Sequence, residues 1–156
     1  MAKTDLPILE QRRIEASIIK PIYQAMADRL GPDTAREILA DAITKDAIAQ
    51  GAAYAASEDG EPTLASFYAL LDQWKASGAL EIELLKQTED ELHFNVTRCK
   101  YAEMYAEMGL SDIGSTLSCA RDGSFCTGYN PDIKLDRTQT IMQGAGFCDF
   151  RFRCPG

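Results

Sequence analysis

The hydrophobic pattern of this chain changes its period near residue 78, and this change limits what the chain can fold into. From residue 7 to residue 78, apolar side chains recur mostly at helical spacing. Beyond that point Leu80, Ile82 and Leu84 alternate with Glu81 and Glu83, a pattern typical of a half-buried strand. The sequence therefore predicts an α+β fold, with N-terminal helices packed on an antiparallel sheet of four or five strands.

Glycine and proline residues mark the ends of the predicted helices. The first helix ends at Gly31-Pro32, and Pro21 is expected to bend it. Asp33 is expected to cap the second helix, and Thr63 the third, which ends at Gly78. The three predicted helices span about 7–30, 33–56 and 63–78.

The second half is predicted to hold two β-hairpins with short helices between them. The second hairpin turns at Gly144-Ala145-Gly146. In order, the predicted elements are a hairpin over 80–96, helices over 100–108 and 112–121, a loop over 123–131, and strands over 133–142 and 147–153. We expect one domain over residues 1–156, with a helical part (1–78) and a sheet part (79–156).

Composition narrows the class of partner. The 156 residues carry a formal net charge of −8, which disfavours nucleic acids and anionic membranes as partners. The sequence has no apolar span of membrane length, and its first residues lack the apolar core of a signal peptide. We therefore expect a cytoplasmic protein that acts on a small molecule. An exposed final hairpin could also pair two copies into a homo-oligomer, although no residue pattern requires it.

Five cysteines cannot all pair with one another, and in a reducing compartment they are expected to be free thiols. On electrostatics, Cys99 is the best-placed nucleophile, because it begins a helix whose dipole favours a thiolate. Cys148 shares a strand face with Phe150 and Phe152 and is equally a small buried core residue. Cys126 and Cys154 are expected to be incidental.

A carboxylate and an arginine accompany these thiols. Cys119 and Asp122 lie three residues apart, so both can point to one side of a helix, and Asp122 is suited to donate a proton or to bind a metal. It is equally a turn residue that ends the helix. Arg137 can bind a carboxylate through both arms of its guanidinium, or pair with Asp136 or Asp149 at the surface.

Other candidates are weaker. Glu15 lies on the apolar line of the first helix, where a charged group needs a partner such as Arg12 or an arginine of the final strands. Such a pair would seal a pocket between the helices and the sheet. Glu15 is otherwise a residue at the rim of the buried surface. His93 is the only histidine, so a catalytic Cys-His pair would have to use it. Its place in the alternation turns it away from the apolar face, which disfavours such a pair. Cys99, Cys119, Asp122 and Cys148 suffice in type for zinc, but their spacing matches no compact zinc motif.

Several stretches together resemble the L-2-amino-thiazoline-4-carboxylic acid hydrolase family over nearly the whole chain. The matching stretches are residues 12–15, 20–23, 98–103, 119–122, 129–131, 137–140, 144 and 148–152. The resemblance implies hydrolytic opening of a nitrogen-containing ring that bears a carboxylate, with a nucleophile among Cys99, Cys119 and Cys148 and with Asp122 managing protons. It implies no required cofactor.

For such a substrate the expected binding residues are Arg137, Thr138, Glu15 and Tyr101. A weaker likeness to four-vinyl-reductase-type ligand-binding domains, in residues 144–148, keeps a second reading open. In that reading the chain is a small-molecule sensor without turnover, with zinc bound in some such domains.

Overall fold

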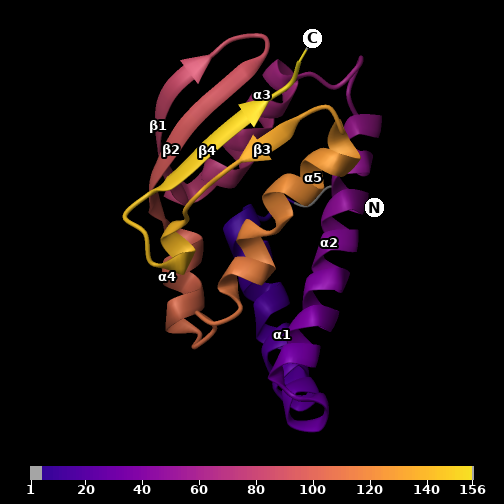
Figure 1. Ribbon diagram of the computed structural model, residues 1–156, viewed down its shortest axis with the longest axis vertical. Coiled ribbons are helices and arrows are strands. Elements are labelled where there is room, and N and C mark those ends of the chain that lie inside the picture. The colour runs from indigo at the N-terminus through magenta and orange to yellow at the C-terminus, as the bar shows by residue number, and fades with distance from the viewer. Residues whose placement is uncertain (1–4, 156) are drawn as a thin grey trace.

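The computed structural model describes residues 5–155, which form helices packed against one face of a four-stranded antiparallel sheet (Figure 1). The strands lie in the order β1-β2-β4-β3. This arrangement confirms the predicted α+β class. The main elements are α1 (Ile8–Leu30), α2 (Pro32–Ala56), α3 (Leu64–Lys75), β1 (Leu80–Gln87), β2 (Glu91–Cys99), α4 (Lys100–Glu107), α5 (Arg121–Tyr129), β3 (Lys134–Asp136) and β4 (Cys148–Arg153).

Strict alternation on the central strands separates the two faces of the sheet. On β2, Leu92, Phe94 and Val96 are buried, and on β4 Cys148 and Phe152 are buried beside them. Side chains of opposite parity project from the outer face. The inner face therefore presents an apolar surface to α3 and α5, as the alternation predicted.

The predicted helix boundaries hold for α1 and for the start of α3, whose predicted last turn is instead a 3₁₀ turn, Ala76–Gly78. The predicted start of α2 fails. Helix α1 continues through Pro21 and ends at Gly31, whose φ of 87° favours glycine. Thr63 caps α3 through a reciprocal capping box with Ser66, as expected. The expected cap of α2 by Asp33 is wrong, because Pro32 occupies the first helical position and leaves Asp33 inside the first turn.

The loop predicted over residues 123–131 is mostly helix. Helix α5 continues to Tyr129 and buries Phe125, Cys126 and Tyr129 at helical spacing, which the glycines in this stretch had obscured. The helix predicted just before it is instead a turn followed by a short π-helix, Ser115–Cys119.

The second hairpin is shorter than predicted. Strand β3 ends at Asp136, and the backbone N–H groups of Thr138 and Gln139 donate to the carboxylate of Asp149 instead of to a neighbouring strand. A 3₁₀ turn, Ile141–Gln143, then leads into the loop before β4. The Asp149 side chain thus accepts the hydrogen bonds that a neighbouring strand would accept in a longer hairpin. The alternation of hydrophobic residues cannot reveal such a substitution.

Two hydrophobic clusters fill the interior. One joins α1, α2 and α4 with residues 110–117, and the other joins α3 and α5 with the inner face of the sheet. Among residues 5–155, no helix is both long enough and apolar enough to cross a bilayer.

Candidate functional site

An aromatic cavity of about 60 Å³ lies within the second cluster, against the inner face of the sheet. One water needs about 10–15 Å³ of such volume, so this space suits a small molecule. Helices α1, α2, α3 and α5 and strands β1, β2 and β4 all contribute to its wall. The lining residues are Arg12, Ala47, Gln50, Phe67, Leu71, Trp74, Leu80, Ile82, Phe94, Val96, Arg121, Asp122, Phe125, Phe150 and Phe152.

Three charged side chains, Arg12, Arg121 and Asp122, lie in this otherwise largely apolar wall. Arg12 and Arg121 are 5% and 7% exposed, and both contact Glu15: Arg12 at 2.7 Å and Arg121 at 3.7 Å. Asp46 accepts a further hydrogen bond from Arg121 at 2.8 Å. Since buried charges need partners, this network holds the two guanidinium groups at the cavity.

Asp122 is the one carboxylate among the cavity-lining residues. Its Oδ2 accepts a hydrogen bond of 2.6 Å from Nη1 of Arg137, and Nη2 of Arg137 donates to the carbonyl of Cys119 at 3.1 Å. The guanidinium also lies 5.0 Å from the centre of the Phe150 ring. Arg137 thus pairs with neither Asp136 nor Asp149, the two surface partners considered from the sequence.

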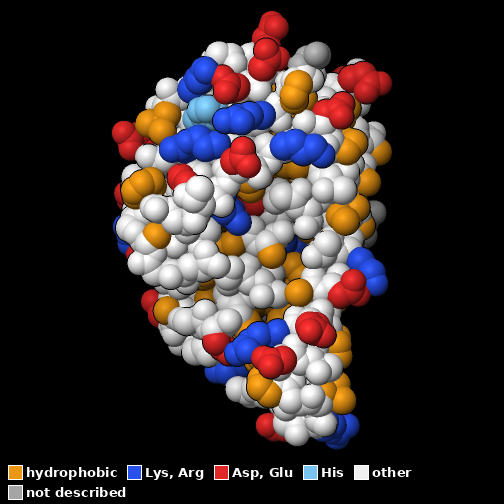
Figure 2. Space-filling model, in the orientation of Figure 1, with side chains coloured by type: hydrophobic (Ala, Val, Ile, Leu, Met, Phe, Trp, Pro, Cys, Tyr) orange, Lys and Arg blue, Asp and Glu red, His pale blue; other side chains and the backbone are white. Residues whose placement is uncertain are grey.

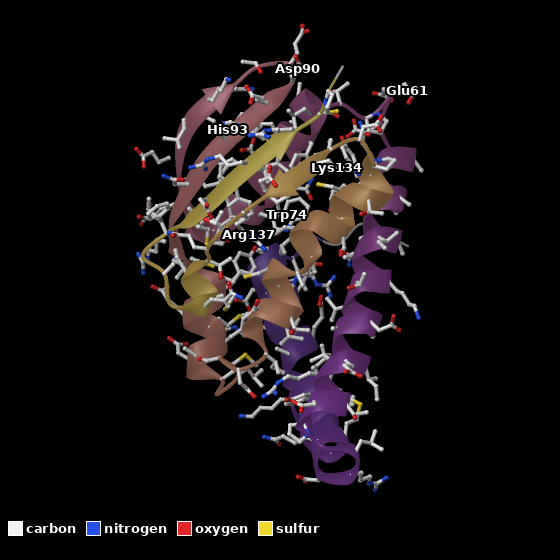
Figure 3. All side chains as sticks on the ribbon, in the orientation of Figure 1. Glu61, Trp74, Asp90, His93, Lys134 and Arg137 are labelled. Carbon is white, nitrogen blue, oxygen red and sulfur yellow. The ribbon has the colours of Figure 1, made fainter. Side chains whose placement is uncertain are left out.

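The Asp122–Arg137 ion pair separates the cavity from an open groove between α5 and β3. Arg137 lines this groove together with Cys119, Ser124, Thr127 and Lys134. Figure 2 shows a hollow on this side of the molecule, and Figure 3 labels Trp74 of the cavity and Arg137 of the groove. The ion pair therefore faces the cavity on one side and solvent on the other.

Burial raises the pKa of Asp122 above its ordinary value, and the neighbouring Arg137 opposes that rise. A carboxyl group in this state holds its proton to higher pH than an exposed aspartate. This is the property that a proton donor to a leaving group requires.

Burial is the main cause of the raised pKa of each of the three candidate thiols, and the charge of Asp122 adds to it, so all three lie within electrostatic range of this carboxyl group. Cys99 caps α4, Cys119 ends the π-helix, and Cys148 begins β4. None of the three lines the aromatic cavity, although Cys119 lines the groove. The thiols are gathered near the acid, outside the aromatic cavity.

The expectation that the helix dipole favours a thiolate at Cys99 is wrong. Burial raises the pKa of Cys99 to about 11, although backbone N–H groups of Ala102 and Tyr101 lower it in part. Burial likewise raises the pKa of Cys119 to about 12, with the charge of Asp122 as the next cause. Desolvation outweighs the dipole at Cys99, and both side chains are neutral thiols at pH 7.

Cys148 is buried on the inner face of the sheet, where its Sγ accepts a hydrogen bond of 3.2 Å from the backbone N–H of Ile141. Burial raises its pKa. Cys126 is 1% exposed in the core and has a pKa raised by burial to about 12.

Two other predicted residues have structural contacts. Tyr101 is 4% exposed and donates to the carbonyl of Trp74 at 3.1 Å, which ties α4 to α3 beside the cavity. Thr138 instead donates to Asp149 through both its backbone N–H and its hydroxyl, so it shapes the segment after β3.

His93 projects from the outer face of the sheet, paired in register with Arg151 and Lys86. A row of basic side chains crosses this face (Figure 2). Because the cavity lies on the inner face, His93 is not a partner for the thiols.

Sequence reasoning missed Arg121 and Gln50 as cavity residues, and it named Arg12 only as a possible partner of Glu15. A signal for Arg12 was present, because Ile8, Arg12 and Ala16 follow at intervals of four on the buried side of α1. An arginine within such a stripe must find a partner or a ligand. Arg121 gave no comparable signal, since its helix was predicted to end there.

Within residues 5–155, no group of three or more His, Cys, Asp or Glu side chains is arranged to hold a metal ion. The four residues considered from the sequence as a zinc set are not clustered as ligands. Asp122 is instead in contact with Arg137.

Structural comparison supports the fold. The phenol-responsive sensory domain of the transcription activator PoxR, solved with phenol, superposes with a TM-score of 0.53 at 10% sequence identity. The match covers 89% of this chain and 74% of that domain. At this identity the likeness concerns the fold alone. No curated protein matches the sequence.

A family model supplies the assignment. The model described as L-2-amino-thiazoline-4-carboxylic acid hydrolase matches residues 11–152. That range contains all of the sheet except Arg153, together with the residues that line the cavity and the Asp122–Arg137 ion pair. The chain therefore belongs to the L-2-amino-thiazoline-4-carboxylic acid hydrolase family.

Proposed function

We propose that this chain hydrolyses a small nitrogen-containing heterocycle that carries a carboxylate, bound in the aromatic cavity. One observation carries the proposal: Asp122, held by Arg137 at 2.6 Å, is the carboxyl group on the wall of an otherwise largely apolar cavity. Aromatic walls suit a flat ring, and a single carboxyl group with a raised pKa suits proton transfer to it. Family membership supports hydrolysis as the reaction class.

In the proposed reaction a nucleophile adds to the ring carbon between nitrogen and sulfur, and the proton that it loses passes to the ring nitrogen. The tetrahedral species then breaks its bond to the ring sulfur, and the departing sulfur takes a proton from Asp122. If the nucleophile is a thiol, a water molecule afterwards replaces it at carbon and regenerates the cysteine. If water attacks directly, no covalent intermediate forms.

Cys119 is the thiol best placed for the covalent route. It lines the groove and not the aromatic cavity, so the covalent route requires the reacting ring carbon to lie at the Asp122–Arg137 ion pair, between the two spaces. Burial and then the charge of Asp122 raise its pKa, and Arg137 lowers it in part. Its pKa of about 12 means that it must lose its proton during attack, because the thiolate is scarce at pH 7.

Ring opening of 2-amino-thiazoline-4-carboxylate, followed by mass spectrometry, tests this function. We expect the wild-type protein to consume the compound, and we expect Cys119→Ser to be the slowest of three variants that include Cys99→Ser and Cys148→Ser. Full activity in all three would leave water as the nucleophile. A wild-type protein that leaves the compound intact would contradict hydrolysis.

The second candidate function is ligand sensing without turnover. The observation that favours it is the fold shared with a phenol-responsive sensory domain, combined with thiols that burial keeps neutral. A sensor would bind a ring compound and release it unchanged. Mass spectrometry of the ligand recovered from the same incubation separates the two candidates.

A further inference from the structure

Arg12 is a buried cation with unused hydrogen-bond donors beside the cavity. It is 5% exposed, lies on the inner side of α1, and lines the cavity. Only its Nη1 donates, to both carboxylate oxygens of Glu15 at 2.7 and 3.2 Å. Within residues 5–155, its Nε and Nη2 have no hydrogen-bond acceptor, and neither is sealed away from space that water can reach.

The two neighbouring arginines differ in this respect. Arg121 uses its Nε on the carbonyl of Leu117 and its Nη1 on Asp46. Its Nη2 faces Glu15 at 3.7 Å. Arg137 is engaged by Asp122 and by the carbonyl of Cys119. Arg12 is therefore the cavity arginine whose donors remain available for a ligand.

The charges around the cavity also leave room for one anion. Arg12, Arg121 and Arg137 face the carboxyl groups of Glu15, Asp46 and Asp122. Burial favours the protonated form of Asp122. With Asp122 protonated, the three arginines and the three carboxyl groups together carry a net charge of +1. A bound carboxylate would balance that charge and would satisfy the unused donors of a buried guanidinium.

We propose that Arg12 anchors the anionic group of the ligand, so that the cavity selects a small flat ring bearing one carboxylate over the same ring without a charge. This inference rests on the site of the proposed function and names the residue that determines its specificity. Arg137, which the sequence suggested for this role, then serves to position Asp122.

The single tryptophan provides the measurement, because Trp74 lines the cavity and its fluorescence should respond to an occupant. Benzoate and benzamide are suitable probes, since they have nearly the same shape and differ in charge. In titrations of the full chain we expect benzoate to bind at least tenfold more tightly than benzamide. Neither probe is a substrate for ring opening, so the result does not depend on turnover.

Variants at two adjacent arginines complete the test. Arg12→Gln should weaken benzoate at least tenfold and leave benzamide unchanged, while Arg12→Lys should recover part of the loss. Arg13→Gln is the matched control, because Arg13 is 43% exposed and pairs with Glu10 away from the cavity; it should bind benzoate like the wild type. Circular dichroism checks that each variant is folded.

Equal binding of both probes by the wild type, or no binding of benzoate, would overturn the proposal even if Arg12→Gln does not fold. Unchanged benzoate affinity in a folded Arg12→Gln variant would also overturn it. Selective benzoate binding without ring opening of any heterocycle would leave the anion site intact and count against hydrolysis alone.

Discussion

Asp122 and Arg137 form the ion pair on which the site is built, joined by a hydrogen bond of 2.6 Å between α5 and the segment after β3. The arginine is further fixed by the Cys119 carbonyl and the Phe150 ring. These contacts hold the carboxyl group at the boundary between the cavity and the groove. They also explain how a largely buried acid remains stable in the fold.

Replacing Arg137 should destabilise the fold, because Asp122 is largely buried and would lose its cationic partner. We expect Arg137→Met to lower the free energy of unfolding at pH 7 by about 2–4 kcal/mol, since Asp122 loses its partner. The loss should shrink as pH falls, because burial raises the pKa of Asp122 and its protonated form needs no cationic partner. In urea denaturation the double variant with Asp122→Asn should be less destabilised than the sum of the two single variants. Additive effects would show that the ion pair contributes no coupling.

The buried thiols predict a loss of stability at alkaline pH. Burial raises the pKa values of Cys99, Cys119 and Cys126 to about 11, 12 and 12, so above pH 9 these thiols ionise in the unfolded chain before they ionise in the folded one. The unfolded state then binds fewer protons, and stability falls as pH rises, by up to about 1.4 kcal/mol per pH unit for each thiol.

Urea denaturation with a reductant at pH 8, 9 and 10 measures this effect. Cys126→Ala serves as the comparison, because it removes one of the thiols from the core. Its stability should fall less steeply between pH 9 and 10 than that of the wild type. Identical slopes would argue against a raised pKa at Cys126.

Close packing of α2 against α5 requires glycine at one crossing point. A Cβ atom at Gly128 would lie 1.9 Å from the backbone oxygen of Ile48, and one at Gly51 would lie 2.0 Å from that of Phe125. We expect Gly128→Ala to cost about 3 kcal/mol or more, since backbone atoms cannot move aside easily. Gly123→Ala, in the same helix but with nothing within 4 Å, should instead stabilise by about 0.5–1 kcal/mol. Thermal denaturation of both variants checks the contrast, and equal effects would contradict this packing.

The sequence predicted the fold class, because Leu92, Phe94 and Val96 alternate strictly and the N-terminal helices have clear periods. It predicted a loop in place of α5, since Gly128, which is typical of a loop, is there to let α2 and α5 approach each other. Gly128 shows why: the need for a small residue arises from Ile48, eighty residues earlier in the chain. Such a contact has no local signal.

The candidate site was predicted in part. Asp122 was identified from its spacing to Cys119, but its partner Arg137 comes from a segment whose path is set by Asp149. The dipole argument at Cys99 overlooked desolvation, which depends on what the fold packs over the thiol. Burial and long-range pairing, which decide the chemistry here, exist only once the chain has folded.

The rate of ring opening by Asp122→Asn tests the central claim most directly. With 2-amino-thiazoline-4-carboxylate as substrate, we expect turnover by this variant to fall by about 10²–10⁴-fold relative to the wild type, because the amide cannot donate the required proton. Asp136→Asn, an exposed aspartate at the end of β3, should keep wild-type turnover. Undiminished turnover by a folded Asp122→Asn variant would contradict the account.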